Sequence, residues 1–252
     1  MSGHSKWSSI KHKKGALDAK RGKIFSKLSK EITTAARLGG GDPDANPRLR
    51  TVLLTARAAN LPKDNVERAI KKGTGELPGV QYEDQTFEGY APGGVALLVE
   101  CMTENKNRTI PEIKNIFAKR GGSLAGPGSV AWIFETKGYI EVEKDKISEE
   151  DLFSIVIDAG AQDLKTETSA YEITMDQGDL ESVRKALDEK KIPMAEHSIT
   201  KLPKNTIEVK ELSQAKAILR LMDELEDHDD VQNVYANFEI PDQMLEELGK
   251  DV

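Results

Sequence analysis

The chain has 252 residues, of which 38% are hydrophobic and 31% are charged, and its formal net charge is -7. No apolar run approaches the roughly 20 residues of a membrane-spanning helix, and no apolar stretch follows the basic N-terminus as in a secretory signal. A single cysteine, Cys101, excludes an internal disulfide and a cysteine-based zinc site. We therefore expect two or three domains, no membrane contact and a location in the reducing cytoplasm.

Charge is unevenly distributed along the chain. Residues 1–75 contain 17 Lys and Arg against 6 Asp and Glu, which gives +11, whereas residues 76–252 contain 19 against 37, which gives -18. Such asymmetry indicates a polyanion-binding part joined to a part that does not bind polyanions. A phosphate backbone would meet the local positive charge rather than the negative average.

The first 20 residues or so have little apolar periodicity and are expected to form a basic arm. Trp7 and His12 lie among the cations, where their rings could stack on bases. A solvated tail is the alternative, but almost no acids neutralise this segment. The predicted nucleic-acid-binding residues of the arm and of the helix that follows it are Lys6, Trp7, Lys11, His12, Lys13, Lys14, Lys20, Arg21, Lys23, Lys27 and Lys30.

Three amphipathic helices are predicted between residues 23 and 74. An apolar stripe indicates the first helix, which the glycines at 39–41 should end. Asn46 is a suitable N-cap for the second helix, with Pro47 at its first position. The third helix should begin near Pro62 and end at Gly73. With the arm, these helices form an expected basic domain over residues 1–77.

The second and third helices allow a further interpretation. They loosely resemble a helix-turn-helix, in which Lys63, Arg68 and Lys71 would make secondary contacts with nucleic acid. The turn lacks the usual glycine, and plain bundle packing is the favoured alternative.

The acidic remainder predicts two α/β modules. In the first, residues 73–94 read as a loop, and Thr109 with Glu112 fits a capping box. Its expected order is β-α-β…β-α-β, with strands at 95–103, 129–135, 205–209 and 231–240 and helices at 107–122 and 213–227.

The second module is predicted within the first. It reads β-α-β-β-α-β, a ferredoxin-like order. Its strands are expected at 138–143, 161–166, 170–175 and 195–203, and its helices at 148–161 and 179–193. The overall class is α+β multidomain, with a discontinuous α/β domain at 78–134 and 204–240, an inserted α/β domain at 135–203 and a tail at 241–252.

The sequence provides no support for catalysis. It lacks a Walker loop and a G-x-G-x-x-G motif, and Cys101 lies in an apolar strand where a core position is expected. The acidic segment 223–230 lacks the spacing of a calcium loop and reads as a solvated helix end. We therefore expect no catalytic residue, metal, cofactor or small-molecule substrate.

Two loops are candidates for additional contacts. Residues 120–132 contain four glycines, so the backbone near Gly126 and Gly128 could approach RNA closely, although a flexible connector is equally possible. Lys106 and Arg108 precede a predicted helix N-terminus, which suits phosphate binding. Helix entry alone also explains those two residues.

Several segments together resemble the YebC/PmpR family. They are "MSGHSKWSSIKHKKGALDAKRGKIFSKLSKEI", "NLPKDNVERAIKKGTGE", "EGYAPGGVALLVE", "NKNRT", "GGSLAGPGSVAWIFE" and "LEDHDDVQNVYANFEI". The resemblance implies a helical N-terminal domain and two α/β domains, one inserted in the other. Members are described as probable DNA-binding transcriptional regulators. Others, including the mitochondrial translational activator of cytochrome oxidase, are linked to the ribosome and to translation of proline-rich stretches.

Two non-enzymatic functions follow from the residues and the resemblance. The first is a DNA-binding transcriptional regulator. The alternative is a translation factor that binds ribosomal RNA and assists synthesis of proline-rich stretches. The sequence indicates neither the target gene nor the oligomeric state.

Overall fold

The computed structural model describes residues 17–241, 244 and 247–248, with side chains from residue 21 onward. They form two compact units. One consists of residues 131–208 and 235–239, and the other of residues 17–130, 209–234 and the described residues from 240 onward. The mixture of helices and antiparallel sheets confirms the α+β multidomain class. The three-domain boundaries stay a prediction.

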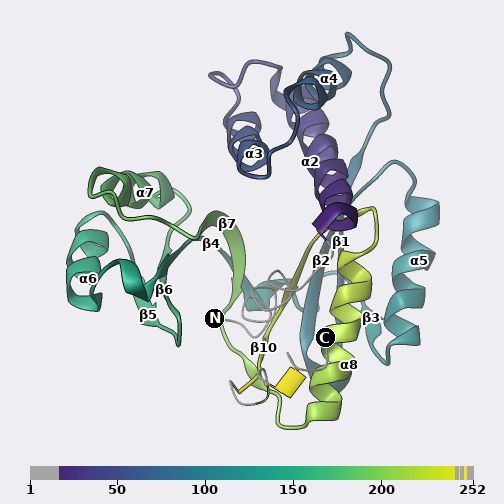
Figure 1. Cartoon of the computed structure of the whole chain (residues 1–252). Helices are drawn as coiled ribbons and strands as arrows, with labels where there is room; N and C mark the ends of the chain where they lie inside the picture. The colour runs from purple at the N-terminus through teal and green to yellow at the C-terminus, as the bar shows by residue number, and fades with distance from the viewer. Residues whose placement is uncertain (1–16, 242–243, 245–246, 249–252) are drawn as a thin grey trace. The chain divides into compact units, whose positions relative to one another are not determined.

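Three helices open the larger unit, as predicted: α2 (Leu17–Gly39), α3 (Pro47–Ala58) and α4 (Lys63–Thr74) (Figure 1). Asn46 caps α3, because its side-chain oxygen accepts a hydrogen bond from the Leu49 amide at 3.1 Å. Its amide nitrogen also donates to the carbonyls of Ala35 and Gly40, each at 2.8 Å. One side chain therefore starts α3 and holds it against the end of α2.

Gly73 does not end the third helix, contrary to the sequence prediction. The left-handed residue that ends α4 is Gly75, with φ of 85°. Gly73 is buried inside the helix, where a Cβ would lie 2.4 Å from the Thr33 carbonyl and 2.7 Å from the Ala36 Cβ. Glycine is present here because α2 and α4 cross at close range.

A four-stranded sheet follows the helices in the larger unit. Its order is β3-β1-β2-β9, and β1 pairs antiparallel with both β2 and β3. The strands are β1 (Glu83–Tyr90), β2 (Ala96–Thr103), β3 (Ser123–Ala125) and β9 (Val231–Ala236). The 3-10 turn η1 (Pro92–Gly94) connects β1 to β2, and the helices α5 (Lys106–Lys119) and α8 (Leu212–Glu226) pack on each other beside the sheet (Figure 1).

The strands of this sheet differ from the prediction. The expected loop 73–94 contains β1, whose first residues are largely exposed and so give little apolar signal. The expected strand 129–135 is mainly a 3-10 turn, η2 (Ala131–Ile133). The expected strand 205–209 is only β8 (Ile207–Glu208), which pairs in parallel with β10 (Phe238–Glu239) in a separate two-stranded sheet.

The smaller unit has the predicted ferredoxin-like module. Its sheet has the order β5-β6-β4-β7, with neighbouring strands antiparallel. The strands are β4 (Phe134–Glu143), β5 (Asp163–Thr166), β6 (Ala170–Met175) and β7 (Glu196–Pro203). The 3-10 turn η3 (Lys144–Lys146) and the helices α6 (Glu149–Asp158) and α7 (Leu180–Glu189) complete it. Its core joins Ile140 and Ile173 of the sheet to Leu152 and Leu187 of the helices, all fully buried.

Within the residues that the structure describes, none of the helices combines the length and apolar character that crossing a lipid bilayer requires.

Candidate nucleic-acid interface

The predicted arm residues Lys6, Trp7, Lys11, His12, Lys13 and Lys14 lie outside the described residues, and so does the side chain of Lys20. Their assignment stays a prediction. The structure places the remaining predicted cations, from Arg21 onward, and shows which of them already have partners.

Three lysines of α2, which are Lys23, Lys27 and Lys30, face the C-terminal end of α8. Lys23 Nζ lies 2.9 Å from Asp227 Oδ1, and Lys27 Nζ donates to the Glu226 carbonyl at 3.0 Å. Lys30 Nζ donates to the Asp229 carbonyl at 3.0 Å. Cations suit the last carbonyls of a helix, which lack partners within the helix. Residues 226–230 therefore contact α2, so the predicted segment 223–230 is a solvated helix end only in part, at exposed positions such as Asp227 and Asp229.

Burial changes the chemistry of one of these lysines. It lowers the pKa of Lys27 below its ordinary value, although Glu226 and Asp227 act in the opposite direction. Lys27 is partly buried, and its ammonium already donates to a backbone carbonyl. It is therefore poorly placed to bind phosphate while α8 stays in position.

Asp230 is the centre of this contact, and its side chain is only 3% exposed. Its carboxylate lies 2.9 Å from Lys30 Nζ and 2.7 Å from an Arg108 guanidinium nitrogen, and it accepts a hydrogen bond from the Thr109 hydroxyl at 2.8 Å. Burial alone would raise the pKa of Asp230, but these hydrogen bonds outweigh it and hold the pKa below its ordinary value. The carboxylate is therefore ionised and fully engaged at neutral pH.

The predicted phosphate site at the start of α5 is occupied by acidic side chains of the protein. Lys106 forms an ion pair with Glu83, and Arg108 binds Asp230. Asn105 is the N-cap, so the predicted capping box of Thr109 and Glu112 is wrong. The helix begins at Lys106, and Thr109 is buried within its first turn instead of preceding it. Lys106 and Arg108 serve to join strands and helices of this unit.

The glycine-rich loop is anchored by an acid that sequence analysis missed. The Glu88 carboxylate accepts hydrogen bonds from the backbone amides of Gly128 and Val130, both at 2.6 Å. Gly128 has φ of 83°, a conformation that favours glycine. Gly126 is exposed, and a Cβ there would meet no atom within 4 Å. The loop is thus fixed at its base, while the backbone at Gly126 stays open to approach.

Cations without partners gather on α4. The side chains of Arg68, Lys71 and Lys72 are exposed and make no hydrogen bond or ion pair with any other described residue, and the same is true of the Arg57 side chain on α3. Lys63 has only a loose contact with Glu67, at 3.7 Å. The predicted secondary contacts Arg68 and Lys71 are therefore more available to phosphate than the lysines of α2. Lys72 was missed, although it follows Lys71 directly in the sequence.

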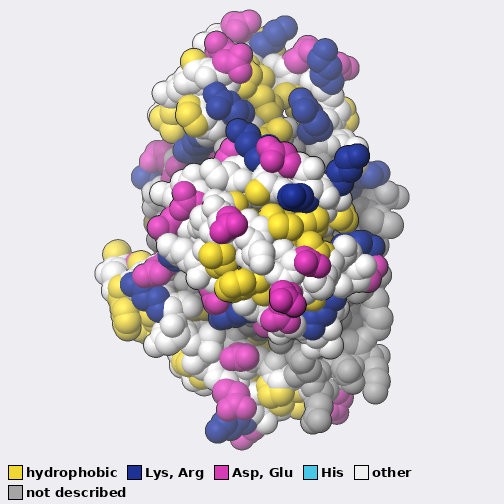
Figure 2. Space-filling view, turned by 90° about the vertical axis from the view of Figure 1, so that its left-hand side faces the viewer, with side chains coloured by type: hydrophobic (Ala, Val, Ile, Leu, Met, Phe, Trp, Pro, Cys, Tyr) yellow, Lys and Arg dark blue, Asp and Glu magenta, His cyan; other side chains and the backbone are white. Residues whose placement is uncertain are grey.

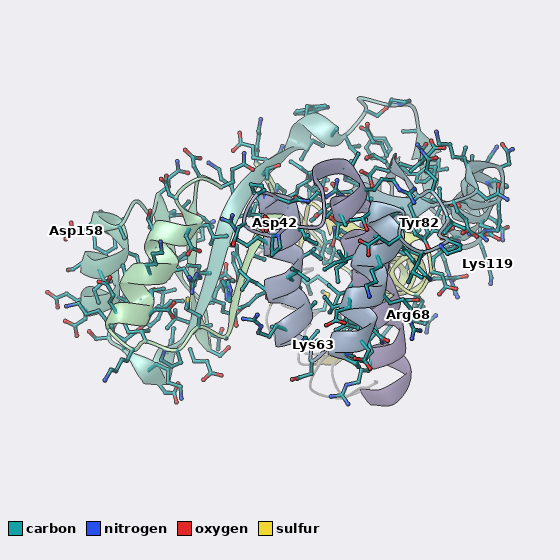
Figure 3. All side chains as sticks on the ribbon, turned by 90° about the horizontal axis from the view of Figure 1, so that it is seen from above. Asp42, Lys63, Arg68, Tyr82, Lys119 and Asp158 are labelled. Atoms are coloured by element: carbon teal, nitrogen blue, oxygen red, sulfur yellow. The ribbon has the colours of Figure 1, made fainter. Side chains whose placement is uncertain are left out.

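A hollow of about 280 Å³ lies between α2 and α4. We call it the α2–α4 groove. Figure 3 labels Arg68 and Lys63 on α4 and Tyr82, which leads into β1. The groove is lined by Ser26, Ser29, Lys30, Thr33, Asn65, Arg68, Ala69, Lys72, Val80 and Tyr82. Asn65 and Arg68 line the groove, so the face of α4 that carries them points toward α2. The helix-turn-helix interpretation stays a prediction.

Charge is mixed on one face of the molecule. On the face shown in Figure 2, Lys and Arg side chains are interspersed with Asp and Glu. Among the described residues, no group of three His, Cys, Asp or Glu side chains could hold a metal ion. The α2–α4 groove with the cations of α4 is the candidate interface within the described part of the chain.

Comparison with known proteins places this arrangement in a family. Residues 5–76 match the model of the TACO1/YebC protein N-terminal domain, and residues 82–238 match that of the TACO1/YebC second and third domain. The chain belongs to the TACO1/YebC family.

Relatives support this membership over nearly the whole length. A TACO1/YebC relative from Syntrophobacter fumaroxidans is 55% identical over 99% of this chain and 100% of its own. Another from Desulfatibacillum aliphaticivorans is 56% identical over 98% and 100%. Each is named "Probable transcriptional regulatory protein". A crystal structure of a conserved hypothetical protein from Aquifex aeolicus is 47% identical, with a TM-score of 0.81 over 92% of this chain and 96% of that one.

Proposed function

We propose that this member of the TACO1/YebC family is a non-enzymatic regulator of gene expression that binds DNA. Its relatives are named as probable transcriptional regulatory proteins and not as enzymes. The excess of +11 in residues 1–75 provides the electrostatic attraction that a phosphate backbone needs. The protein would act in the cytoplasm.

The observation that carries the proposal is the sorting of the cations. Lys23, Lys27 and Lys30 of α2 and Lys106 and Arg108 of α5 are held by carboxylates and carbonyls of the same unit. Arg68, Lys71 and Lys72 have exposed side chains without partners among the described residues. A cation that already has an acidic partner must lose it to bind phosphate, but an unpaired cation need not. The α4 cations, together with the predicted arm, form the proposed phosphate-binding surface.

Binding to a labelled DNA duplex over a range of salt concentrations tests the proposal. If about six cations neutralise phosphates, the affinity should fall by about five decades per decade of salt. Deleting residues 1–20 should remove most of the affinity and leave the fold intact, and Lys71→Gln should reduce it further. Lys114→Gln is the control, because Lys114 is an exposed, unpartnered lysine on α5. No binding by the intact chain, or no salt dependence, would refute the proposal.

Ribosomal RNA is the second candidate target, with assistance to synthesis of proline-rich stretches as the resulting function. The observation in its favour is Tyr82 in the wall of the α2–α4 groove, since single-stranded RNA is commonly recognised by stacking on aromatic side chains. Crosslinking in cells followed by sequencing of the bound nucleic acid separates the two. Enriched promoters without ribosomal RNA would exclude this second function.

A further inference from the structure

We propose that the α2–α4 groove binds an unpaired nucleotide of a single strand, with its phosphate on Arg68 and Lys72 and its base against Tyr82. This inference rests on the proposed nucleic-acid binding and deepens it. It assigns a defined site and a preference for unpaired nucleotides, which the basic character of the region alone does not imply.

One face of α4 forms the first wall of the groove. Asn65, Arg68 and Lys72 are separated by three and four residues, so they lie on one face of the helix. All three line the groove. On the other wall, α2 contributes Ser26 and Lys30, which are also four residues apart. The close crossing of the two helices at Gly73 fixes the distance between these walls.

The charged residues that line the α2–α4 groove indicate where a phosphate would bind. Among the described residues that line the α2–α4 groove, none is acidic. A neighbouring hollow of about 490 Å³ shares Ser26, Lys30 and Tyr82 with it, but that hollow is also lined by acids: Glu104, Asp229 and Asp230. These acids offset the cations Lys23, Lys30 and Arg108 in the same lining, so a phosphate would gain little attraction there. It would be attracted in the α2–α4 groove, where Arg68 offers several donors in a planar group and Lys72 a point charge.

Tyr82 provides the surface for a base. Its ring is half-buried, and Lys30 Nζ lies 5.6 Å from the ring centroid. Burial raises the pKa of Tyr82, so the hydroxyl stays neutral at physiological pH and can donate a hydrogen bond. The Asn65 amide and the Ser26 hydroxyl add donors and acceptors for a base edge. An aromatic ring, hydrogen-bonding groups and cations are the components of known single-strand sites.

Size restricts the ligand to one nucleotide at a time. A groove of about 280 Å³ is slightly smaller than the usual pocket for a small ligand, about 300 Å³ or more. Bases within a duplex are stacked and paired, so their faces cannot reach a ring inside such a groove, whereas unpaired bases can. The groove should therefore prefer single strands.

Fluorescence anisotropy with the full chain tests the inference, using a 12-nucleotide single-stranded RNA, the matching DNA strand and the corresponding duplex. Arg68→Gln combined with Lys72→Gln should weaken single-strand binding at least tenfold and lower the magnitude of the salt slope by about 1.4. The matched control is Lys63→Gln with Lys71→Gln, which removes the same charge from α4 outside the groove. It should have a clearly smaller effect.

The Tyr82 variants test the stacking contact. Tyr82→Leu should weaken single-strand binding by about tenfold, as expected for loss of one stacked base, whereas Tyr82→Phe should keep most of it. Because Tyr82→Leu could disturb the fold, ultraviolet crosslinking of the unmodified protein to the same strands gives a second measurement. The crosslinked peptide should contain Tyr82. A higher affinity for RNA than for DNA would indicate recognition of the 2′-hydroxyl, and equal affinities would indicate recognition of base and phosphate alone.

The possible failures are distinguishable. If the intact chain binds no nucleic acid, both the proposed function and this inference are wrong. If it binds but the control pair weakens binding as much as the groove pair, the groove is not the site and the proposed function stands. Equal losses for the duplex and the single strands would overturn the preference for unpaired nucleotides.

Discussion

Asp230→Asn tests whether the contact between α2 and the end of α8 depends on one buried carboxylate. Asp230 is the shared partner of Lys30, Arg108 and Thr109, and the Lys30 side chain is itself only 15% exposed. Asparagine keeps the size of the side chain but removes its charge. The substitution therefore leaves a largely buried ammonium without its counter-charge.

We expect the free energy of unfolding at pH 7 to fall by about 3 kcal/mol. This is the lower end of the range for removing one partner of a buried pair, because the pair retains some access to solvent. The effect should depend on pH. The folded state holds the pKa of Asp230 below the unfolded value of about 3.9, so its contribution is fully present above that value. It is lost as the pH falls through the folded pKa, since the carboxyl group then becomes protonated.

Urea unfolding followed by circular dichroism measures this difference at pH 7 and at pH 3. The control is Asp227→Asn, because the pair of Lys23 and Asp227 has side chains 42% and 67% exposed. Such an exposed pair should contribute no more than about 1 kcal/mol. The reasoning is refuted if the two variants lose equal stability at pH 7, or if the deficit of Asp230→Asn does not become smaller at low pH.

Two further predictions concern packing and reactivity. Gly73→Ala should lower the free energy of unfolding by about 2 kcal/mol, because the added Cβ forces α2 and α4 apart. The control is Gly22→Ala, whose added Cβ meets no atom within 4 Å and which should leave the free energy of unfolding unchanged or raise it by up to about 1 kcal/mol. Similar melting temperatures for the two variants would contradict this. Burial raises the pKa of the Cys101 thiol to about 12, so iodoacetamide at pH 8 should modify the urea-unfolded protein but not the native protein. Mass spectrometry measures the modification. Rapid modification of the native protein would contradict the prediction.

Local patterns predicted much of this fold. The Asn46-Pro47 start of α3 was predictable because capping depends on residues that are neighbours in sequence. The ferredoxin-like module was also predictable, since short, regular strands alternate with amphipathic helices there. In each case the information lies within about ten residues of the element that it specifies.

The features that the sequence did not predict depend on contacts between different elements of the structure. β1 is a strand because it pairs with β2 over eight residues, not because its own residues alternate clearly. Gly73 resembled a helix end because a glycine required by a helix crossing and a glycine required by a turn look the same in sequence. The partners of Lys27 and Lys30 lie about 200 residues further along the chain, and residue spacing cannot predict contacts over such a separation.

The partners of the α2 lysines change how the charge distribution of the chain is interpreted. From the sequence, the lysines of α2 and the acids of segment 226–230 belong to opposite halves of an asymmetric molecule. In the structure they neutralise one another, so part of the local +11 is used to join the helices to the sheet. The charge available to a phosphate is the remainder, which within the described residues includes Arg57, Arg68, Lys71 and Lys72. Net charge predicts which third of the chain would bind a polyanion, but the pairing of individual cations is needed to propose which face of that third would do so.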